Sequence, residues 1–214
     1  MSIIRIYNLR SGRKMIHNTP KLIFFDLETT GFNPFHCNII EIAAKDNRGN
    51  TFHSLVDPKT KIPTKITSIT HITNSMVKNK PTIDLVLNDF IKYCFKGVKK
   101  NEVIYLIAHN GNAFDQVFLE RKLFECCIEI PKWRYIDSLH LAQYLLPKRM
   151  SHSLKNLCRH WNLVQENAHR AMSDVEDLEK IFELLIHTWE YKYNEVTIPE
   201  IYEFLSPKNN IKTI

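Results

Sequence analysis

The sequence predicts a single mixed α/β domain, and three observations support that prediction. Three short runs rich in β-branched and aromatic residues, LIFFD, NIIEIAAKD and NTFHSLVD, follow one another with only brief polar turns between them. Segments with helical spacing follow, and a further buried strand, VIYLIA at 103–108, lies between them. The chain of 214 residues is long enough to bury one hydrophobic core of ordinary size. This order of elements is typical of a mixed sheet with helices packed against it.

Two segments carry clear helical periodicity. One face of the segment 83–94 is apolar, through Ile83, Val86, Leu87, Phe90 and Cys94. The longest helix is expected to start at 174, because SDVE has the form of a capping box in which Ser173 caps and Glu176 reaches back. Its apolar face is Val175, Leu178, Ile181, Phe182, Leu185 and Trp189.

Shorter helices are expected near 113–126, 138–146 and 153–161, and another in TIPEIYEFL close to the C-terminal end. In the first of these, Asn112 is the expected N-cap. The lysine- and proline-rich stretch after the third strand is expected to be a loop.

Composition places the chain among soluble globular proteins. Hydrophobic residues make up 44% and charged residues 24%, and no apolar stretch reaches the length of a membrane span. We find no secretory signal at the N-terminus. The five cysteines lack CxxC spacing, which argues against a disulfide framework and makes a Cys/His zinc site the weakest alternative. We therefore expect an intracellular protein, cytoplasmic or nuclear, with no membrane partner.

The charge of the chain suits a phosphate-bearing partner. Its formal net charge is +6, and the first 25 residues contain five basic residues and no acidic one. Lysine-rich composition also arises in proteins with no nucleic-acid function, so charge alone leaves both interpretations open.

Asp26 and Glu28 raise a sharper question, because they end the first strand one residue apart. Side chains at i and i+2 of a strand point to the same face, so the two carboxylates would repel each other unless a cation lay between them. A strand end that runs into a polar turn at Gly31 is one interpretation, and a metal site is the other. Asp115 and Asp174 fall in first turns of predicted helices, where a lone acid is often only a partner of the helix dipole.

Taken together, these motifs resemble the DEDDh family of DnaQ-like 3′–5′ exonucleases. FFDLETTG is similar to the first motif of that family, AHNGNAFDQVFL to the second and HRAMSDV to the third, whose H-x4-D spacing is that of the histidine branch. The resemblance covers roughly residues 20–190. It implies a ribonuclease H-like fold, a mixed central sheet flanked by α-helices in a single exonuclease domain.

The resemblance also implies roles for individual residues. Four carboxylates are expected to hold two Mg²⁺ ions, for which Mn²⁺ can substitute, and His169 is expected to be the general base. These metal ligands and catalytic residues are Asp26, Glu28, Asp115 and Asp174. The expected substrate contacts are Thr29, Thr30, Phe32, Asn110 and Phe114. Glu41 and His109 are expected to support the site, although a purely structural role suits both almost equally well, and Phe32 could instead belong to the core.

The function implied is metal-dependent hydrolysis of single-stranded nucleic acid from its 3′ end, releasing mononucleotides. DNA is favoured, in proofreading or end processing, with trimming of RNA 3′ ends as the alternative and a non-catalytic nucleic-acid-binding relative as a further one. A polymerase or another protein partner is possible under this resemblance. We expect a basic N-terminal extension over 1–20, the exonuclease domain over 21–190, and a short helix with a tail over 191–214. One departure from the family stands out: His71, in THIT, occupies a position where members usually carry glycine.

Overall fold

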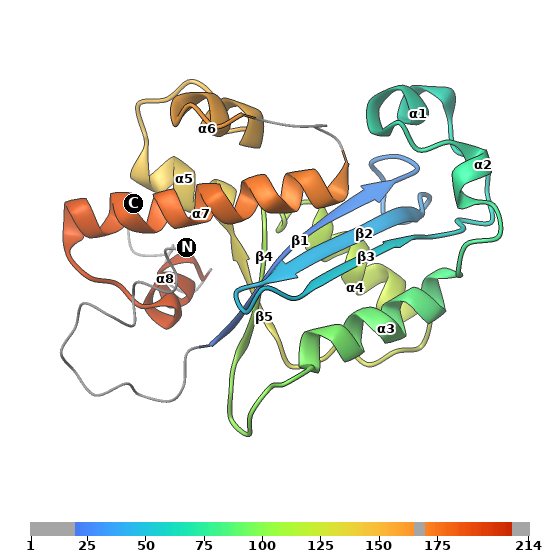
Figure 1. The fold of residues 1–214 in the computed structure, drawn as a ribbon, viewed down its shortest axis with the longest axis horizontal. Helices are drawn as coiled ribbons and strands as arrows, with labels where there is room; N and C mark the ends of the chain where they lie inside the picture. The colour runs from blue at the N-terminus through green and yellow to red at the C-terminus, as the bar shows by residue number, and fades with distance from the viewer. Residues whose placement is uncertain (1–19, 165–169, 207–214) are drawn as a thin grey trace.

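A five-stranded mixed sheet with helices on both faces forms the centre of the computed structural model, which describes residues 20–164 and 170–206 (Figure 1). The strands are β1 (Lys21–Thr29), β2 (Ile39–Asp46), β3 (Thr51–Leu55), β4 (Ile104–Ala108) and β5 (Arg134–Asp137). Their order in the sheet is β3-β2-β1-β4-β5. The first three pair as antiparallel neighbours, whereas β4 runs parallel to β1 and β5 parallel to β4. The predicted fold class is confirmed.

Eight helices lie in the described part of the chain. They are α1 (Thr64–Thr70), α2 (Asn74–Val77), α3 (Ile83–Phe95), α4 (Asp115–Glu125), α5 (Ser138–Leu145), α6 (Leu154–His160), α7 (Ala171–Tyr193) and α8 (Ile198–Leu205). The short helix predicted in TIPEIYEFL is α8, and its capping box joins Thr197 and Glu200. The stretch expected to be a loop after β3 instead contains α1 and α2, which pack a small separate core of isoleucines and one valine against β2.

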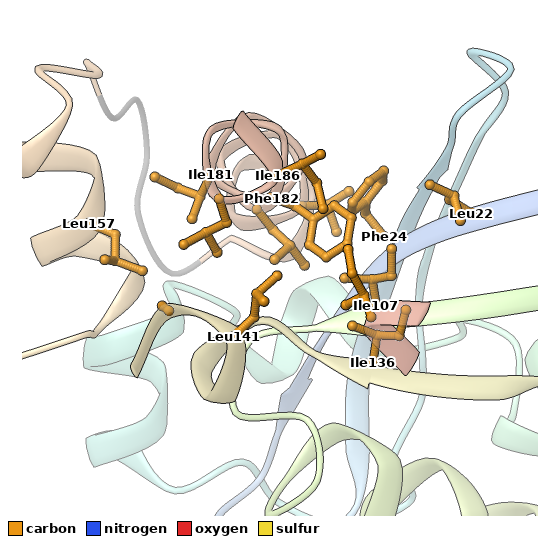
Figure 2. Close-up of a cluster of buried hydrophobic side chains, with 14 of the residues drawn as sticks. Leu22, Phe24, Ile107, Ile136, Leu141, Leu157, Ile181, Phe182 and Ile186 are labelled. Atoms are coloured by element: carbon orange, nitrogen blue, oxygen red, sulfur yellow. The ribbon is translucent and has the colours of Figure 1, made fainter. Parts of the chain in front are cut away.

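Alternation along β1 divides the core between the two faces of the sheet. Leu22 and Phe24 point to the face covered by α7, where Phe24 meets Phe182 edge to face with 5.6 Å between ring centroids (Figure 2). Ile23 and Phe25 point to the other face, which α3 and α4 cover. Because the side-chain period is two, Asp26 and Glu28 continue the row of Leu22 and Phe24 and lie on the α7 face.

Two predicted helix starts are wrong. The helix α7 begins at Ala171 with Arg170 as its N-cap, three residues before the predicted start, so Ser173 is not the cap. Similarly, α4 begins at Asp115 with Phe114 as its N-cap, and Asn112 is not the cap. At α7 a long-range hydrogen bond from the Ala171 N–H to Glu41, described below, replaces the local cap that the sequence suggests, whereas α4 has no side-chain cap.

No helix within residues 20–164 and 170–206 is long and apolar enough to cross a membrane. All five cysteines lie in these ranges and are free.

Candidate functional site

Asp26, Glu28 and Asp174 converge at the end of β1. The first two come from neighbouring positions on one face of the strand, and the third comes from the first turn of α7, which packs across that face. One potential ligand atom from each carboxyl group lies within 4.8 Å of the other two. All three side chains are partly exposed, so a ligand can reach them.

Asp115 lies beside this group rather than in it. It is 3% exposed, and its Oδ1 accepts a hydrogen bond of 3.1 Å from the backbone N–H of Leu27, which stands between Asp26 and Glu28. The first residue of α4 is thereby tied to the end of β1. The structure thus brings three of the four predicted metal ligands into one cluster and places the fourth against the same strand.

Burial and mutual repulsion both disfavour the ionised form of these acids. Burial, followed by the charges of Asp115, Glu28 and Asp174, holds the pKa of Asp26 well above its usual range. Burial and the neighbouring carboxylates raise the pKa of Glu28 to about 8, and burial raises the pKa of Asp115 to about 7. A divalent cation would offset this repulsion, and a donor set made only of carboxylate oxygens suits a hard ion such as Mg²⁺ or Mn²⁺. The residues present therefore fit a divalent metal site.

Glu41 lies directly opposite Glu28 on β2 and anchors the start of α7. Its carboxylate accepts hydrogen bonds from the backbone N–H of Ala171 at 3.1 Å, from the guanidinium of Arg170 at 2.9 Å, and pairs with Nε2 of His53 at 2.8 Å. Burial alone would raise the pKa of Glu41, but these hydrogen bonds outweigh it and lower the pKa to about 2. Glu41 is therefore an ionised support beneath the acid cluster. Arg170 and His53 were not singled out in the sequence, because their partner is distant along the chain.

The predicted base, His169, lies outside the described residues. Its neighbour Arg170 is described, and its ion pair with Glu41 fixes the point at which α7 begins. The charge of Arg170 also acts on Glu28, whose pKa it lowers against the stronger effects of burial and the other acids.

Thr29 and Thr30 follow the acids and are 5% and 7% exposed. The hydroxyl of Thr29 donates to the backbone carbonyl of Gly31 at 2.5 Å, and the hydroxyl of Thr30 accepts from the backbone N–H of Asn38 at 2.9 Å. Both side chains thus brace the turn after β1. A Cβ at Gly31 would lie 2.7 Å from Sγ of Cys37, so a larger residue there would displace the Cys37 side chain.

Phe32 is 74% exposed, so it is not part of the core. Its ring lies 6.3 Å from the ring of Phe114, whose own ring packs 4.8 Å from that of Phe118 on α4. The two predicted substrate contacts thus form an aromatic pair in which one ring is held by the core and the other projects into solvent. Such a pair presents a face on which a base can stack.

Asn110 is exposed and adopts a left-handed conformation with φ of 65°. Its turn is held by Asp137, whose carboxylate accepts from the backbone N–H groups of Asn110 at 2.9 Å, Asn112 at 3.0 Å and Leu139 at 2.9 Å. Asp137 is 3% exposed and was missed as a site residue, although an acid at a strand end directly before a helix is a recognisable signal.

The ring of His109 bonds to α5 and to the segment between α5 and α6, and not to the acids of the cluster. Its Nε2 lies 2.8 Å from the carbonyl of His152, and its Nδ1 lies 2.9 Å from the hydroxyl of Ser138. A carbonyl only accepts, so Nε2 carries the hydrogen and Nδ1 of the neutral ring accepts from Ser138. Burial lowers the pKa of His109, which favours this neutral form. The structural role is the one that these contacts support.

His71 ends α1 with φ of 60° and ψ of 11°, in the left-handed region. Glycine adopts this conformation without strain, which explains why the family usually carries it there. The departure leaves the acid cluster unchanged.

The sequence and the fold of this chain are similar to those of known exonucleases. A family model described as Exonuclease (RNase T) matches residues 23–182. The chain is 38% identical over 163 residues to DNA polymerase III PolC-type of Clostridium perfringens, a match covering 74% of this chain and 11% of that protein. It is 38% identical over 176 residues to Exonuclease DPD1, chloroplastic/mitochondrial, of Arabidopsis thaliana, covering 77% and 55%. It is 33% identical over 177 residues to DNA polymerase III subunit epsilon of Treponema pallidum, covering 80% and 79%.

Among solved structures, E. coli Exonuclease I in complex with a dA16 oligonucleotide superposes with a TM-score of 0.69 at 19% identity, over 87% of this chain and 43% of that one. This likeness shows the fold. The chain spans about half the length of the plant exonuclease and about a tenth of the clostridial polymerase. The family match, which includes the three motifs and their acids, shows that the chain belongs to the DEDDh, DnaQ-like exonuclease family of the ribonuclease H-like superfamily.

Proposed function

We propose that this chain hydrolyses phosphodiester bonds one nucleotide at a time from the 3′ end of single-stranded nucleic acid, with DNA as the favoured substrate. The convergence of Asp26, Glu28 and Asp174 within 4.8 Å, with Asp115 beside them, is the observation that supports it most strongly. Dependence on a divalent metal ion is a property of the family, and the all-oxygen donor set is consistent with it.

In this proposal the four carboxylates hold two Mg²⁺ ions, for which Mn²⁺ can substitute. The ions would supply positive charge at the scissile phosphate and at the departing oxygen. The chain itself supplies orientation. Glu41 and Arg170 fix the start of α7 and so the position of Asp174, while the Leu27 N–H fixes the carboxyl group of Asp115.

The terminal nucleotide would lie against the Phe32–Phe114 pair, with the backbone around Thr29, Thr30 and Asn110 close to its sugar. Stacking requires the last base to leave its neighbours, which favours single strands. A polymerase partner remains a prediction; one relative is named as a polymerase subunit.

His169 would accept the proton of the attacking water, since an imidazole titrates close to neutral pH. Replacing His169 by alanine should lower kcat by about 10²- to 10⁴-fold and leave oligonucleotide affinity nearly unchanged. The exposed His160 on α6 is the matched control, and His160→Ala should keep native turnover. Native turnover in His169→Ala would place the base elsewhere.

The polarity of digestion tests the proposal as a whole. Matched DNA and RNA oligonucleotides labelled at the 5′ end should shorten progressively from the 3′ end to give mononucleotides, and a blocked 3′-OH should slow the reaction. Faster digestion of RNA than of DNA would select the RNA-trimming alternative. A ladder that starts from the 5′ end, or internal cuts in a circular single strand, would contradict the proposal.

A further inference from the structure

A basic lobe lies next to the acid cluster. The α1–α2 lobe, residues 57–82, contains five lysines and a single acidic residue, Asp57. The five lysines are exposed, and they are Lys59, Lys61, Lys65, Lys78 and Lys80. Lys59 pairs with Asp57 at 2.8 Å, whereas the other four form no ion pair with any described residue. Four uncompensated positive charges therefore lie on one small lobe.

The lobe is a packed unit and not a loose loop. Ile62, Ile66, Ile72 and Val77 form its interior together with Ile40 of β2. The side chain of Asn74 adds a hydrogen bond of 2.9 Å from the N–H of Ile62 to its Oδ1. The segment that contains the lysines is thus packed against the sheet.

Asn38 fixes the lobe to the rim of the site. Its backbone N–H donates to the hydroxyl of Thr30, two residues after Glu28, and its side-chain amide donates to the carbonyl of Pro58 at 3.2 Å and the hydroxyl of Thr60 at 3.3 Å. Its Oδ1 accepts from Nζ of Lys122 on α4 at 2.9 Å. Through its backbone and its side chain, Asn38 therefore joins the turn after β1, the start of the lobe and α4. In Figure 1 the lobe lies beyond the arrowhead of β1, at the same end of the sheet as the first turn of α7.

Resting on the proposed function, we propose that the α1–α2 lobe binds the phosphate backbone of the strand just upstream of the 3′ end. The acid cluster repels phosphates, so a strand whose end enters it gains from positive charge close by. The lobe supplies that charge at the rim, next to Thr30. Contacts to phosphates are independent of sequence, which suits an enzyme that removes every nucleotide in turn.

The test measures binding apart from cleavage. Fluorescence anisotropy of a 5′-labelled dT20 oligonucleotide in EDTA should show several-fold weaker binding for Lys61→Gln/Lys65→Gln and for Lys78→Gln/Lys80→Gln than for the native chain. The slope of log Kd against log salt concentration should fall by about 0.7 for each phosphate that a removed lysine no longer neutralises. The control is Lys99→Gln/Lys100→Gln, which removes the same charge from exposed lysines in the turn before β4, at the opposite end of the sheet. It should bind like the native chain.

A second measurement separates this inference from the proposed function. The p-nitrophenyl ester of thymidine 5′-monophosphate contains one nucleotide and does not extend to the lobe, so its hydrolysis should keep native kcat and KM in the lysine variants. If the native chain hydrolyses neither the oligonucleotide nor the nitrophenyl ester, but the lysine substitutions weaken binding as expected, the proposed function is overturned. The lobe assignment is then still supported. Native affinity and salt dependence in both lobe variants would overturn the lobe assignment, as would be seen if the lobe recognised an acidic protein instead. An equal weakening in the control would overturn it too.

Discussion

Glu28 and Glu41 lie directly opposite each other across the β1–β2 pair, and their carboxyl groups have pKa values shifted in opposite directions. The pKa of Glu28 is raised to about 8 by burial and by Asp174, Glu41 and Asp115. The pKa of Glu41 is lowered to about 2, because hydrogen bonds from His53, Arg170 and Ala171 outweigh its burial. The negative charge of Glu41 is therefore compensated by groups of the protein itself, whereas the ionised form of Glu28 requires a bound cation.

The raised pKa of Glu28 predicts a pH-dependent cost in the metal-free protein. Between about pH 4.5 and pH 8 the folded chain keeps a proton that the unfolded chain has lost, so this group lowers the stability as pH rises. Glu28→Gln should therefore raise the Tm in EDTA at pH 8 and leave it nearly unchanged at pH 4.5. Thermal unfolding followed by circular dichroism measures both values.

Bound metal should remove the difference in Tm between Glu28→Gln and the native chain at pH 8, because a bound cation favours the ionised carboxylate. In 10 mM Mg²⁺ at pH 8, the native chain is expected to gain more in Tm than Glu28→Gln does. Glu129→Gln, at an exposed acid far from the cluster in sequence, is the control and should follow the native chain. A Glu28→Gln variant that is less stable than the native chain in EDTA at pH 8 would contradict the assignment.

Glu41 predicts a pH dependence of stability opposite to that of Glu28. Its lowered pKa contributes stability that is fully present above about pH 4.5 and is lost as the pH falls towards 2. Glu41→Ala leaves Arg170 and the Ala171 N–H without their acceptor, so it should lower the free energy of unfolding by about 2–3 kcal/mol at pH 7. Urea unfolding at pH 7 and pH 3 measures the loss, which should be smaller at pH 3.

The control for Glu41 is a surface ion pair. Asp89 pairs with Lys92 on α3, and both side chains are well exposed, so Asp89→Asn should cost less than about 1 kcal/mol at either pH. An equal effect of the two substitutions would mean that Glu41 does not anchor α7.

Phe32 is expected to contribute to substrate binding and not to the stability of the fold. Stacking of one base on an aromatic ring is worth about 1–3 kcal/mol, so Phe32→Ala should raise KM for an oligonucleotide by about 5- to 150-fold. Its Tm should stay native, because the ring is 74% exposed. Phe124 on α4 is 71% exposed and is the matched control, for which Phe124→Ala should leave KM unchanged. A drop in Tm with unchanged KM in Phe32→Ala would assign Phe32 a packing role instead.

His71 predicts a gain in stability. A left-handed residue other than glycine is strained, so His71→Gly should raise the free energy of unfolding by about 0.5–1 kcal/mol. Ser68→Gly, within the same short helix, should change it in the other direction by about the same amount. Chemical denaturation of both variants tests the pair, and a loss of stability in His71→Gly would show that the imidazole makes a stabilising contact.

The sequence was sufficient for features that depend on neighbouring residues. Alternation in LIFFD placed Asp26 and Glu28 on one face of a strand, because a period of two admits no other arrangement there. The apolar repeat of α7 was equally clear. The acids of the second and third motifs came from the family resemblance, since a lone acid in a first helical turn has an ordinary electrostatic explanation.

Features that depend on distant partners were missed. The local capping box at Ser173 placed the start of α7 three residues too late, because the Ala171 N–H is capped by Glu41 from another strand. Asn112 was misassigned as the cap of α4, because it lies in the preceding turn, where its N–H bonds to the distant Asp137. Asn38 and Arg170 likewise gain their roles only when strands and helices meet.

Cleavage by the native chain and by Asp26→Asn, in Mg²⁺ and in EDTA, is a direct test of metal-dependent hydrolysis at the acid cluster. A 5′-labelled single-stranded oligonucleotide should shorten from its 3′ end only when the native chain is given Mg²⁺ or Mn²⁺. Asp26→Asn should produce no ladder under any condition, while its Tm in EDTA stays equal to that of the native chain or rises, because one acid has left a repelling cluster. Undiminished shortening in EDTA, or by Asp26→Asn in Mg²⁺, would contradict metal-dependent hydrolysis at these acids.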